Sequence, residues 1–90
     1  MFEWDEQKNE ANISKHRVDF EEVIPVFFSR EALIVQDNRK DYGEDRFIIL
    51  CPLGGRVLHV TYTRRGVSVR IISARRANNR ERRLYEQHQA

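Results

Sequence analysis

Residues 67–85 constrain the fold of this chain most, because they join a strand pattern directly to a helix start. Apolar side chains recur there with the two-residue period of a half-buried strand: Val67, Val69 and Ile71. The alternation ends at Ser73. Asn78, followed three residues later by Glu81, has the pattern of a capping box, in which the two residues close the first helical turn by reciprocal hydrogen bonds. The segment therefore predicts a strand that leads into a C-terminal helix.

Positive charge is concentrated in the same part of the chain. Residues 1–63 carry eight Lys or Arg and twelve Asp or Glu, whereas residues 64–90 carry eight Arg and two Glu. Every basic residue after Arg56, histidines aside, is arginine, whose planar guanidinium binds phosphate through two hydrogen bonds and stacks on bases. This favours a nucleic-acid role over the alternative, a solvated helix face that binds an acidic partner.

Length and composition indicate a single soluble domain spanning residues 1–90. The chain has 40% hydrophobic and 33% charged residues, which is typical of a globular protein. No apolar run is long enough to span a membrane, and the first residues do not resemble a signal peptide. The single cysteine, Cys51, excludes an internal disulfide and a multi-cysteine metal site, and we interpret it as a core thiol. A cytoplasmic protein is expected.

A first helix is predicted at residues 6–16, after a short edge strand at residues 2–4, with Asp5 as its N-cap. Four polar residues share one side of this helix: Lys8, Asn12, Lys15 and His16. Two interpretations stay open. Either the stripe faces an RNA substrate, or Asn12 and His16 form hydrogen bonds that fix the helix end while both lysines are solvated.

A second helix is predicted to begin near Phe20, with a kink or break at Pro25, which lacks an N–H and crowds the carbonyl one turn earlier. Strand patterns follow at residues 32–36, 46–51 and 57–63, separated by a polar loop at 37–45 and turns at 52–55 and 64–66. These elements predict an α+β fold in which two N-terminal helices and one C-terminal helix cover one face of an antiparallel sheet of three to five strands. Arg70, with His59 and Thr61, is expected on the open face.

Two signatures make the chain resemble the BrnT toxins of bacterial type II toxin–antitoxin modules. The N-terminal one comprises Phe2, Trp4, Asp5, Lys8, Asn12, Lys15, His16, Val18, Phe20 and Glu21. The C-terminal one comprises residues 70–75 with Ala77, Glu81, Arg82 and Tyr85, and Arg46-Phe47 fits a strand between them. The sequence departs from the family pattern at Arg17, where glycine is common, at Asn78, where threonine is common, and at Pro25.

The resemblance implies a RelE-like fold and a ribonuclease that arrests translation without a metal or cofactor. It also implies a BrnA-type antitoxin with a ribbon-helix-helix DNA-binding domain as partner, so that operator DNA is contacted only through the antitoxin. RNA is the implied substrate, either free or on the ribosome. A second hypothesis is a non-catalytic basic module that binds nucleic acid or a DNA-binding repressor partner. No acidic cluster at useful spacing supports a metal-dependent nuclease.

Metal-free RNA cleavage needs a base, an acid and cations that hold the charge building on the phosphate. Within the two signatures, Arg70 and Arg75 are candidates for binding the scissile phosphate. Lys15 or His16 is the candidate base or acid. Tyr85 is a candidate proton donor, although packing in the core beside Leu84 is the alternative.

Three further arginines are predicted to form a stripe on the C-terminal helix that binds backbone phosphates: Arg76, Arg80 and Arg83. The same patch could bind an acidic antitoxin surface. Glu81 is interpreted as a helix cap rather than a general base. His59 lies outside the signatures and is interpreted as a surface strand residue.

Overall fold

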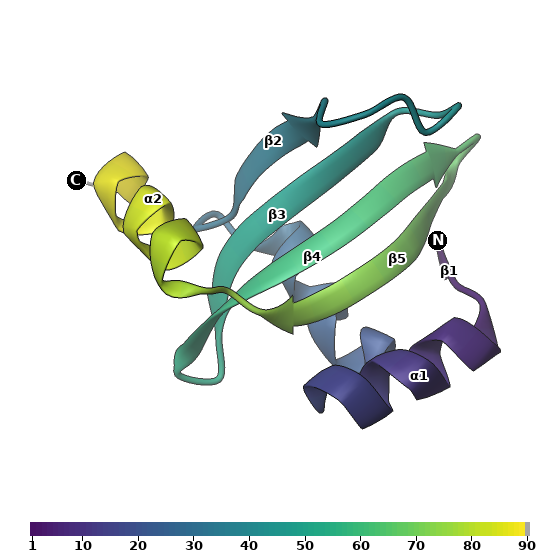
Figure 1. Ribbon diagram of the computed structural model, residues 1–90, viewed down its shortest axis with the longest axis horizontal. Helices are drawn as coiled ribbons and strands as arrows, with labels where there is room; N and C mark the ends of the chain where they lie inside the picture. The colour runs from purple at the N-terminus through teal and green to yellow at the C-terminus, as the bar shows by residue number, and fades with distance from the viewer. Residues whose placement is uncertain (90) are drawn as a thin grey trace.

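The computed structural model, which describes residues 1–89, is an α+β fold built on a curved sheet (Figure 1). Within those residues the sheet has five strands in the order β1-β5-β4-β3-β2, accompanied by two α-helices and one 3-10 helix. The elements are β1 (Phe2–Glu3), α1 (Glu6–His16), η1 (Phe20–Phe28), β2 (Leu33–Asp37), β3 (Arg46–Leu53), β4 (Arg56–Arg65), β5 (Ser68–Arg76) and α2 (Asn79–Gln89). The α+β class, the position of α1 and its Asp5 cap confirm the sequence-based predictions.

The sheet is mixed rather than antiparallel throughout. β2, β3, β4 and β5 are antiparallel neighbours joined by hairpins, as predicted. β1, however, runs parallel to β5, with Phe2 opposite Val69 and Glu3 opposite Arg70. The prediction of a wholly antiparallel sheet was therefore wrong for this strand. Turn signals specify only neighbours in sequence, and the partner of β1 is 67 residues away along the chain, so no local pattern reveals it.

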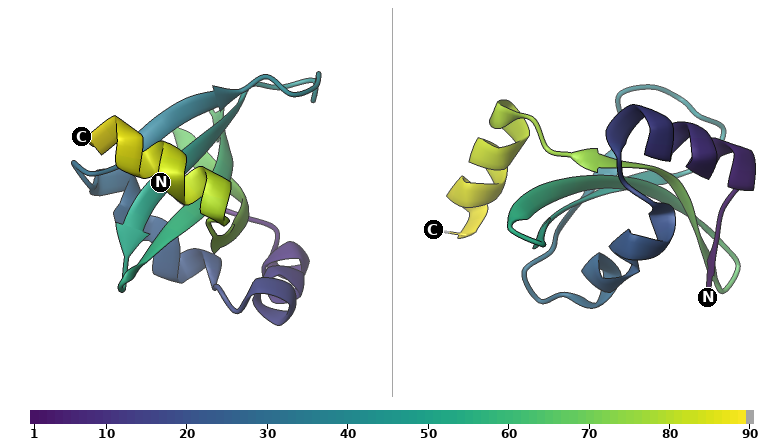
Figure 2. Two further views of the ribbon diagram at one scale, coloured as in Figure 1. Left: turned by 60° about the vertical axis from the view of Figure 1, so that its left-hand side comes forward. Right: turned by 90° about the horizontal axis from the view of Figure 1, so that it is seen from below.

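The helices lie on both faces of the sheet, which corrects the prediction that they cover one face. On β3, Ile49 and Cys51 belong to the main core with the buried residues of η1, whereas Leu50 between them packs with Ala77 and Tyr85. Because neighbouring strand residues point to opposite faces, α2 covers the face opposite η1, while α1 lies along the outer edge of β5. In the right-hand view of Figure 2, α2 lies at the opposite end of the sheet from α1.

The second predicted helix is a 3-10 helix that continues through Pro25. Its buried residues are spaced by three: Phe20, Val23 and Val26. A 3-10 helix has three residues per turn, so this spacing places all three on one face, and Pro25 is left exposed. The predicted start near Phe20 is confirmed, and Asp19 and Glu22 form a capping box there. The tighter helix takes the place of the expected kink or break.

β5 is longer than predicted because a β-bulge interrupts its alternation. Thr61 pairs with Ser73, but Tyr62 pairs with Ile71, so Ile72 is the extra residue. The strand then continues to Arg76 instead of ending near Ser73. A bulge adds one residue to a strand, so each side chain after it points to the face opposite the one that simple alternation predicts. Arg75 therefore points to the same face as Arg70, although five positions separate them.

Arg17 ends α1 in the left-handed conformation, with φ 61° and ψ 32°, and its N–H donates to the Ile13 carbonyl. Glycine takes this conformation without the Cβ clash that costs other residues roughly 1–2 kcal/mol. We expect Arg17→Gly to raise the free energy of unfolding by about 1 kcal/mol, measured by urea denaturation. Arg17→Ala is the matched control, since it removes the same side chain but keeps Cβ. Equal stability of the two variants would contradict the strain.

Candidate active site

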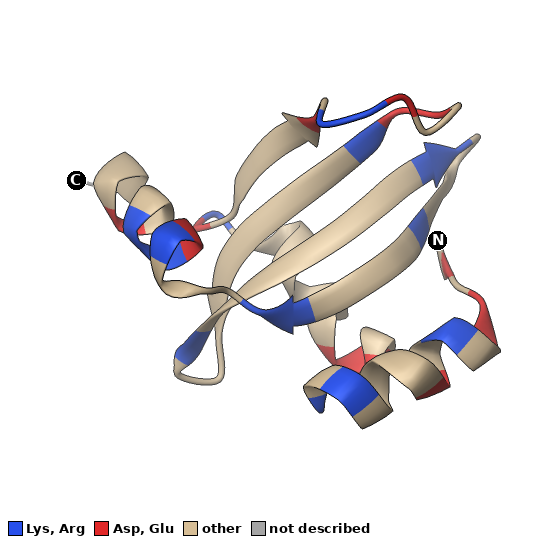
Figure 3. Ribbon diagram, in the orientation of Figure 1, with Lys and Arg blue, Asp and Glu red and all other residues tan. Residues whose placement is uncertain are grey.

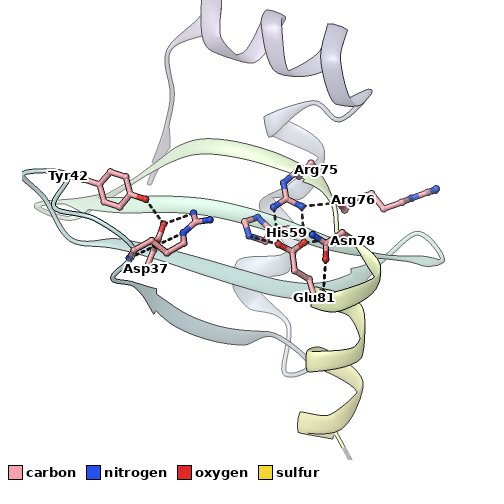
Figure 4. Close-up of polar contacts among 8 residues, drawn as sticks. Asp37, Tyr42, His59, Arg75, Arg76, Asn78 and Glu81 are labelled. Atoms are coloured by element: carbon pink, nitrogen blue, oxygen red, sulfur yellow. Dashed lines mark hydrogen bonds and ion pairs between the residues drawn. The ribbon is translucent and has the colours of Figure 1, made fainter.

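The predicted arginine Arg75 lies at the centre of a polar cluster on the face covered by α2 (Figure 4). Its two terminal nitrogens donate to the two carboxylate oxygens of Glu81, over 2.8 and 3.0 Å. Glu81 stands in the first turn of α2, where Asn78 and Glu81 form the predicted capping box with bonds of 3.0 and 2.8 Å. The bonds from Arg75 and the Asn78 N–H lower the pKa of Glu81 to about 2 against the effect of burial. Both the cap and the ion pair therefore fix Arg75 in place.

His59 lies directly across the ladder from Arg75, on β4. Its Nε2 is 3.5 Å from the nearer Glu81 oxygen, and its Nδ1 is buried with no hydrogen-bond partner among the described residues. Burial and then the charge of Arg75 lower the pKa of His59, while Glu81 partly opposes them, so the imidazole is neutral at pH 7. The prediction of a surface residue was wrong, because His59 is only 4% exposed.

A third member of the cluster is Arg39, which stands in the loop after β2 and is held by Asp37, the last residue of that strand. Asp37, whose side chain is 1% exposed, accepts two hydrogen bonds from the Arg39 guanidinium, at 2.8 and 2.9 Å, and one from the Tyr42 hydroxyl. These bonds, those from Arg39 above all, hold the pKa of Asp37 far below its usual range. Arg39 is 69% exposed, yet its guanidinium is held in one orientation. Its charge also acts on His59.

Four arginines line one hollow of about 760 Å³ beside α2, which we call the arginine hollow. Its lining residues are Arg39, Arg75, Asn78, Arg80, Glu81, Arg83, Leu84 and Gln87. Figure 3 shows basic segments at the end of β5 and along the first turns of α2. Glu81 is the single acidic group among these residues, so the hollow attracts anions such as phosphate.

Lys15 and His16 lie near Arg75 at the outer edge of β5, the edge that does not pair with β4. They form the last turn of α1, which packs along this strand. Lys15 is exposed and His16 is partly buried. Burial, with the charges of Lys15 and Arg75, lowers the pKa of His16, so this imidazole is also neutral at pH 7. The structure thus brings three of the predicted residues into one neighbourhood.

Arg70 and Tyr85 lie outside that neighbourhood. Arg70 is five positions before Arg75 on β5, roughly 16 Å along a strand, and forms an ion pair of 2.9 Å with Glu3. Tyr85 is buried against Leu50 and Ala77, and its hydroxyl donates to the Glu31 carbonyl over 2.6 Å. Burial raises the pKa of Tyr85. The core-packing alternative for Tyr85 is therefore the one that the structure shows.

The predicted arginine stripe is split. Arg80 and Arg83 line the arginine hollow, but Arg76 is the last residue of β5, not a residue of the helix. Arg76 lines a separate hollow with Arg56 and Arg82. The error has the same origin as the misplaced strand end, since the bulge that prolongs β5 was not predicted.

Sequence reasoning missed His59 and Arg39 as members of the site. In the sequence, Arg39 is marked only by its position two residues after Asp37. His59 is marked only by its place in an alternating strand pattern. Within residues 1–89, no group of three or more His, Cys, Asp or Glu side chains is placed to hold a metal ion. The helices described there are too short and too polar to cross a membrane.

Comparison with known protein families gives a match over most of the chain. A model of the ribonuclease toxin BrnT of type II toxin–antitoxin systems matches residues 4–81, which include the N-terminal signature from Trp4 onward and the C-terminal signature up to Glu81. No curated protein matches the chain.

Proposed function

The chain belongs to the BrnT family of ribonuclease toxins of type II toxin–antitoxin systems, and we propose that it cleaves RNA at the arginine hollow without a metal ion. Membership of the family makes RNA the substrate class and an antitoxin protein the partner. We further propose the finer points of the resemblance: a RelE-like fold, a BrnA-type ribbon-helix-helix antitoxin and a cytoplasmic location. The observation that carries the proposal is the convergence of four arginines on one hollow around the fixed Arg75–Glu81 pair.

In the proposed reaction Arg75 binds the scissile phosphate. Its guanidinium has five N–H donors, and two terminal nitrogens are held by Glu81, so the orientation is set before the substrate arrives. Preorganised donors stabilise charge that develops in the transition state without a cost of reorganisation. Arg80 and Arg83, on α2, bind neighbouring phosphates and position the strand. The hollow therefore supplies the positive charge that the phosphate needs.

The base and acid of the proposed reaction come from the end of α1. His16 is neutral at pH 7 because its pKa is lowered, so it can accept the proton of the 2′-hydroxyl. The 2′-oxygen then attacks phosphorus, the bond to the 5′-oxygen breaks, and the Lys15 ammonium donates a proton to that leaving oxygen. The products are a 2′,3′-cyclic phosphate and a 5′-hydroxyl. Arg70 and Tyr85, which lie elsewhere, take no part in this scheme.

The test is cleavage of a labelled RNA by the purified protein in excess EDTA, with and without translating ribosomes. We expect fragments with 2′,3′-cyclic phosphate ends in at least one of the two conditions. Fragments that form only when a divalent cation is restored would overturn the metal-free mechanism. RNA binding without fragments in either condition would make the protein a binding module.

The pH dependence of the same reaction tests the base. A base acts in its neutral form, so the rate should rise with pH through the lowered pKa of His16 and level off by neutral pH. His16→Asn should abolish this rise. A rate that still climbs between pH 7 and 8 in the unaltered protein would contradict a base with a lowered pKa.

A further inference from the structure

A second, smaller hollow of about 250 Å³ adjoins the arginine hollow. Its lining residues are Val35, Gln36, Asp37, Asn38, Arg39, Ile48, Leu50, His59, Glu81 and Leu84. Three of these also line the arginine hollow: Arg39, Glu81 and Leu84. The two hollows therefore adjoin one another, and we call the smaller one the apolar hollow.

The floor and walls of the apolar hollow come from rigid elements. Ile48 and Leu50 of β3 and His59 of β4 point to the same face of the sheet, because Leu50 pairs with His59 and Ile48 lies two residues away on its strand. Leu84 of α2 stands on one side. Arg39 is held on the other side by its bonds to Asp37. The hollow thus has an apolar floor and a planar cation at its edge.

One polar group in this floor has no partner. The His59 side chain is 95% buried, and its Nδ1 forms no hydrogen bond among residues 1–89. Buried polar groups are satisfied in most native proteins, and an exception calls for an explanation, such as a role at a functional site. Nδ1 itself is enclosed by protein atoms, so the hollow offers a ligand an apolar floor that includes the His59 ring, with the polar groups of Arg39 and Glu81 at its edge. This lining suits a flat apolar body that has hydrogen-bonding groups at its rim.

We propose that the apolar hollow is a nucleobase subsite, in which one base of the RNA lies against Ile48, Leu50 and Leu84 with its polar edge at the rim of the hollow. The Arg39 guanidinium is placed to stack on the base or to hold its phosphate. The four arginines of the adjoining hollow favour a nucleotide over an apolar peptide, because a base in the apolar hollow keeps its own phosphate beside Arg39 and Arg75. The subsite rests on the proposed function only in taking RNA as the nucleic acid.

A pair of substitutions on β2 tests the subsite. Val35 lines the apolar hollow and is 39% exposed, whereas Ile34 beside it is 50% exposed and points to the other face. Val35→Trp should fill the hollow, and Ile34→Trp is the matched control. The probe is a 2′-O-methyl RNA pentamer, which cannot be cleaved, compared with the same backbone without bases. Binding is measured by fluorescence anisotropy at fixed salt.

We expect the unaltered protein and Ile34→Trp to bind the pentamer with bases on the order of tenfold more tightly than the abasic one, as one base stack contributes. Val35→Trp should bring this ratio close to one while binding of the abasic backbone stays unchanged. A ratio near one in the unaltered protein, or an undiminished ratio in Val35→Trp, would overturn the subsite. If RNA is never cleaved but the ratio behaves as expected, the subsite stands and the ribonuclease mechanism fails.

Discussion

Arg75→Gln should lower the rate of RNA cleavage by roughly 100-fold or more, the size of effect seen when one preorganised donor to a developing anion is removed. Arg75 is the residue that Glu81 holds by two bonds, and its charge acts on both His16 and His59. Glutamine keeps a polar side chain of similar reach but loses the positive charge. Initial rates with a labelled RNA, under the conditions in which the unaltered protein cuts, measure the effect.

Arg76→Gln is the matched control for this variant. Arg76 is the next residue of β5, has the same charge and lines a different hollow, so its loss should change the rate by less than about threefold at moderate salt. Arg75→Gln leaves Glu81 without its main partner, so thermal unfolding must show that the variant is folded at the assay temperature. Equal rates of RNA cleavage for the two variants would show that Arg75 does not bind the scissile phosphate.

The same pair of arginines marks the limit of what the sequence could predict. Capping patterns located the start of α1, the start of η1 and the turn into α2, because these signals are local and chemically specific. The bulge at Ile72 was not predictable, since an apolar pair at Ile71 and Ile72 fits a strand end as well as a bulge. That one residue decides which face receives Arg75.

The histidine beside Arg75 illustrates a second limit. Alternation along β4 correctly placed His59 on the face opposite Leu58 and Val60. The sequence-based prediction, however, left that face open to solvent. Whether the face is open depends on where α2 folds back, and this is decided by Tyr85 packing on Leu50. Tertiary contacts of this kind carry no periodic signal in the helix. Burial, and with it the lowered pKa of His59, therefore had to come from the structure.

Asn12→Ala should lower the free energy of unfolding by about 3 kcal/mol, because it leaves several buried backbone groups without partners. Asn12 is buried, and its side-chain amide donates to the carbonyls of Val18 and Ala74, at 2.9 and 2.7 Å, while its oxygen accepts from the Ala74 N–H at 3.2 Å. Of the two interpretations of the polar stripe, exposure to RNA is therefore wrong for Asn12. Urea denaturation of the two proteins measures the difference.

The position of Ala74 explains why so large an effect is expected. β1 pairs with β5 only near Val69 and Arg70, so the outer edge of β5 has no strand beside it at Ala74. Asn12 takes the place of that strand for one N–H and one carbonyl, and it joins α1 to the residue before Arg75. Loss of the amide leaves these groups buried without partners, and each such group costs about 1–3 kcal/mol.

Glu10→Ala is the control on the same helix, since Glu10 is exposed and its loss should change stability by less than about 0.5 kcal/mol. Asn12→Asp is the sharper variant. It keeps an acceptor for the Ala74 N–H but turns a carboxylate toward two carbonyl oxygens, so it should be at least as destabilising as alanine. If Asn12→Ala is as stable as Glu10→Ala, α1 is held by other contacts. If the asparagine variants are destabilised as expected, α1 and the edge of β5 form one unit, and the end of α1 that carries Lys15 and His16 is fixed relative to Arg75.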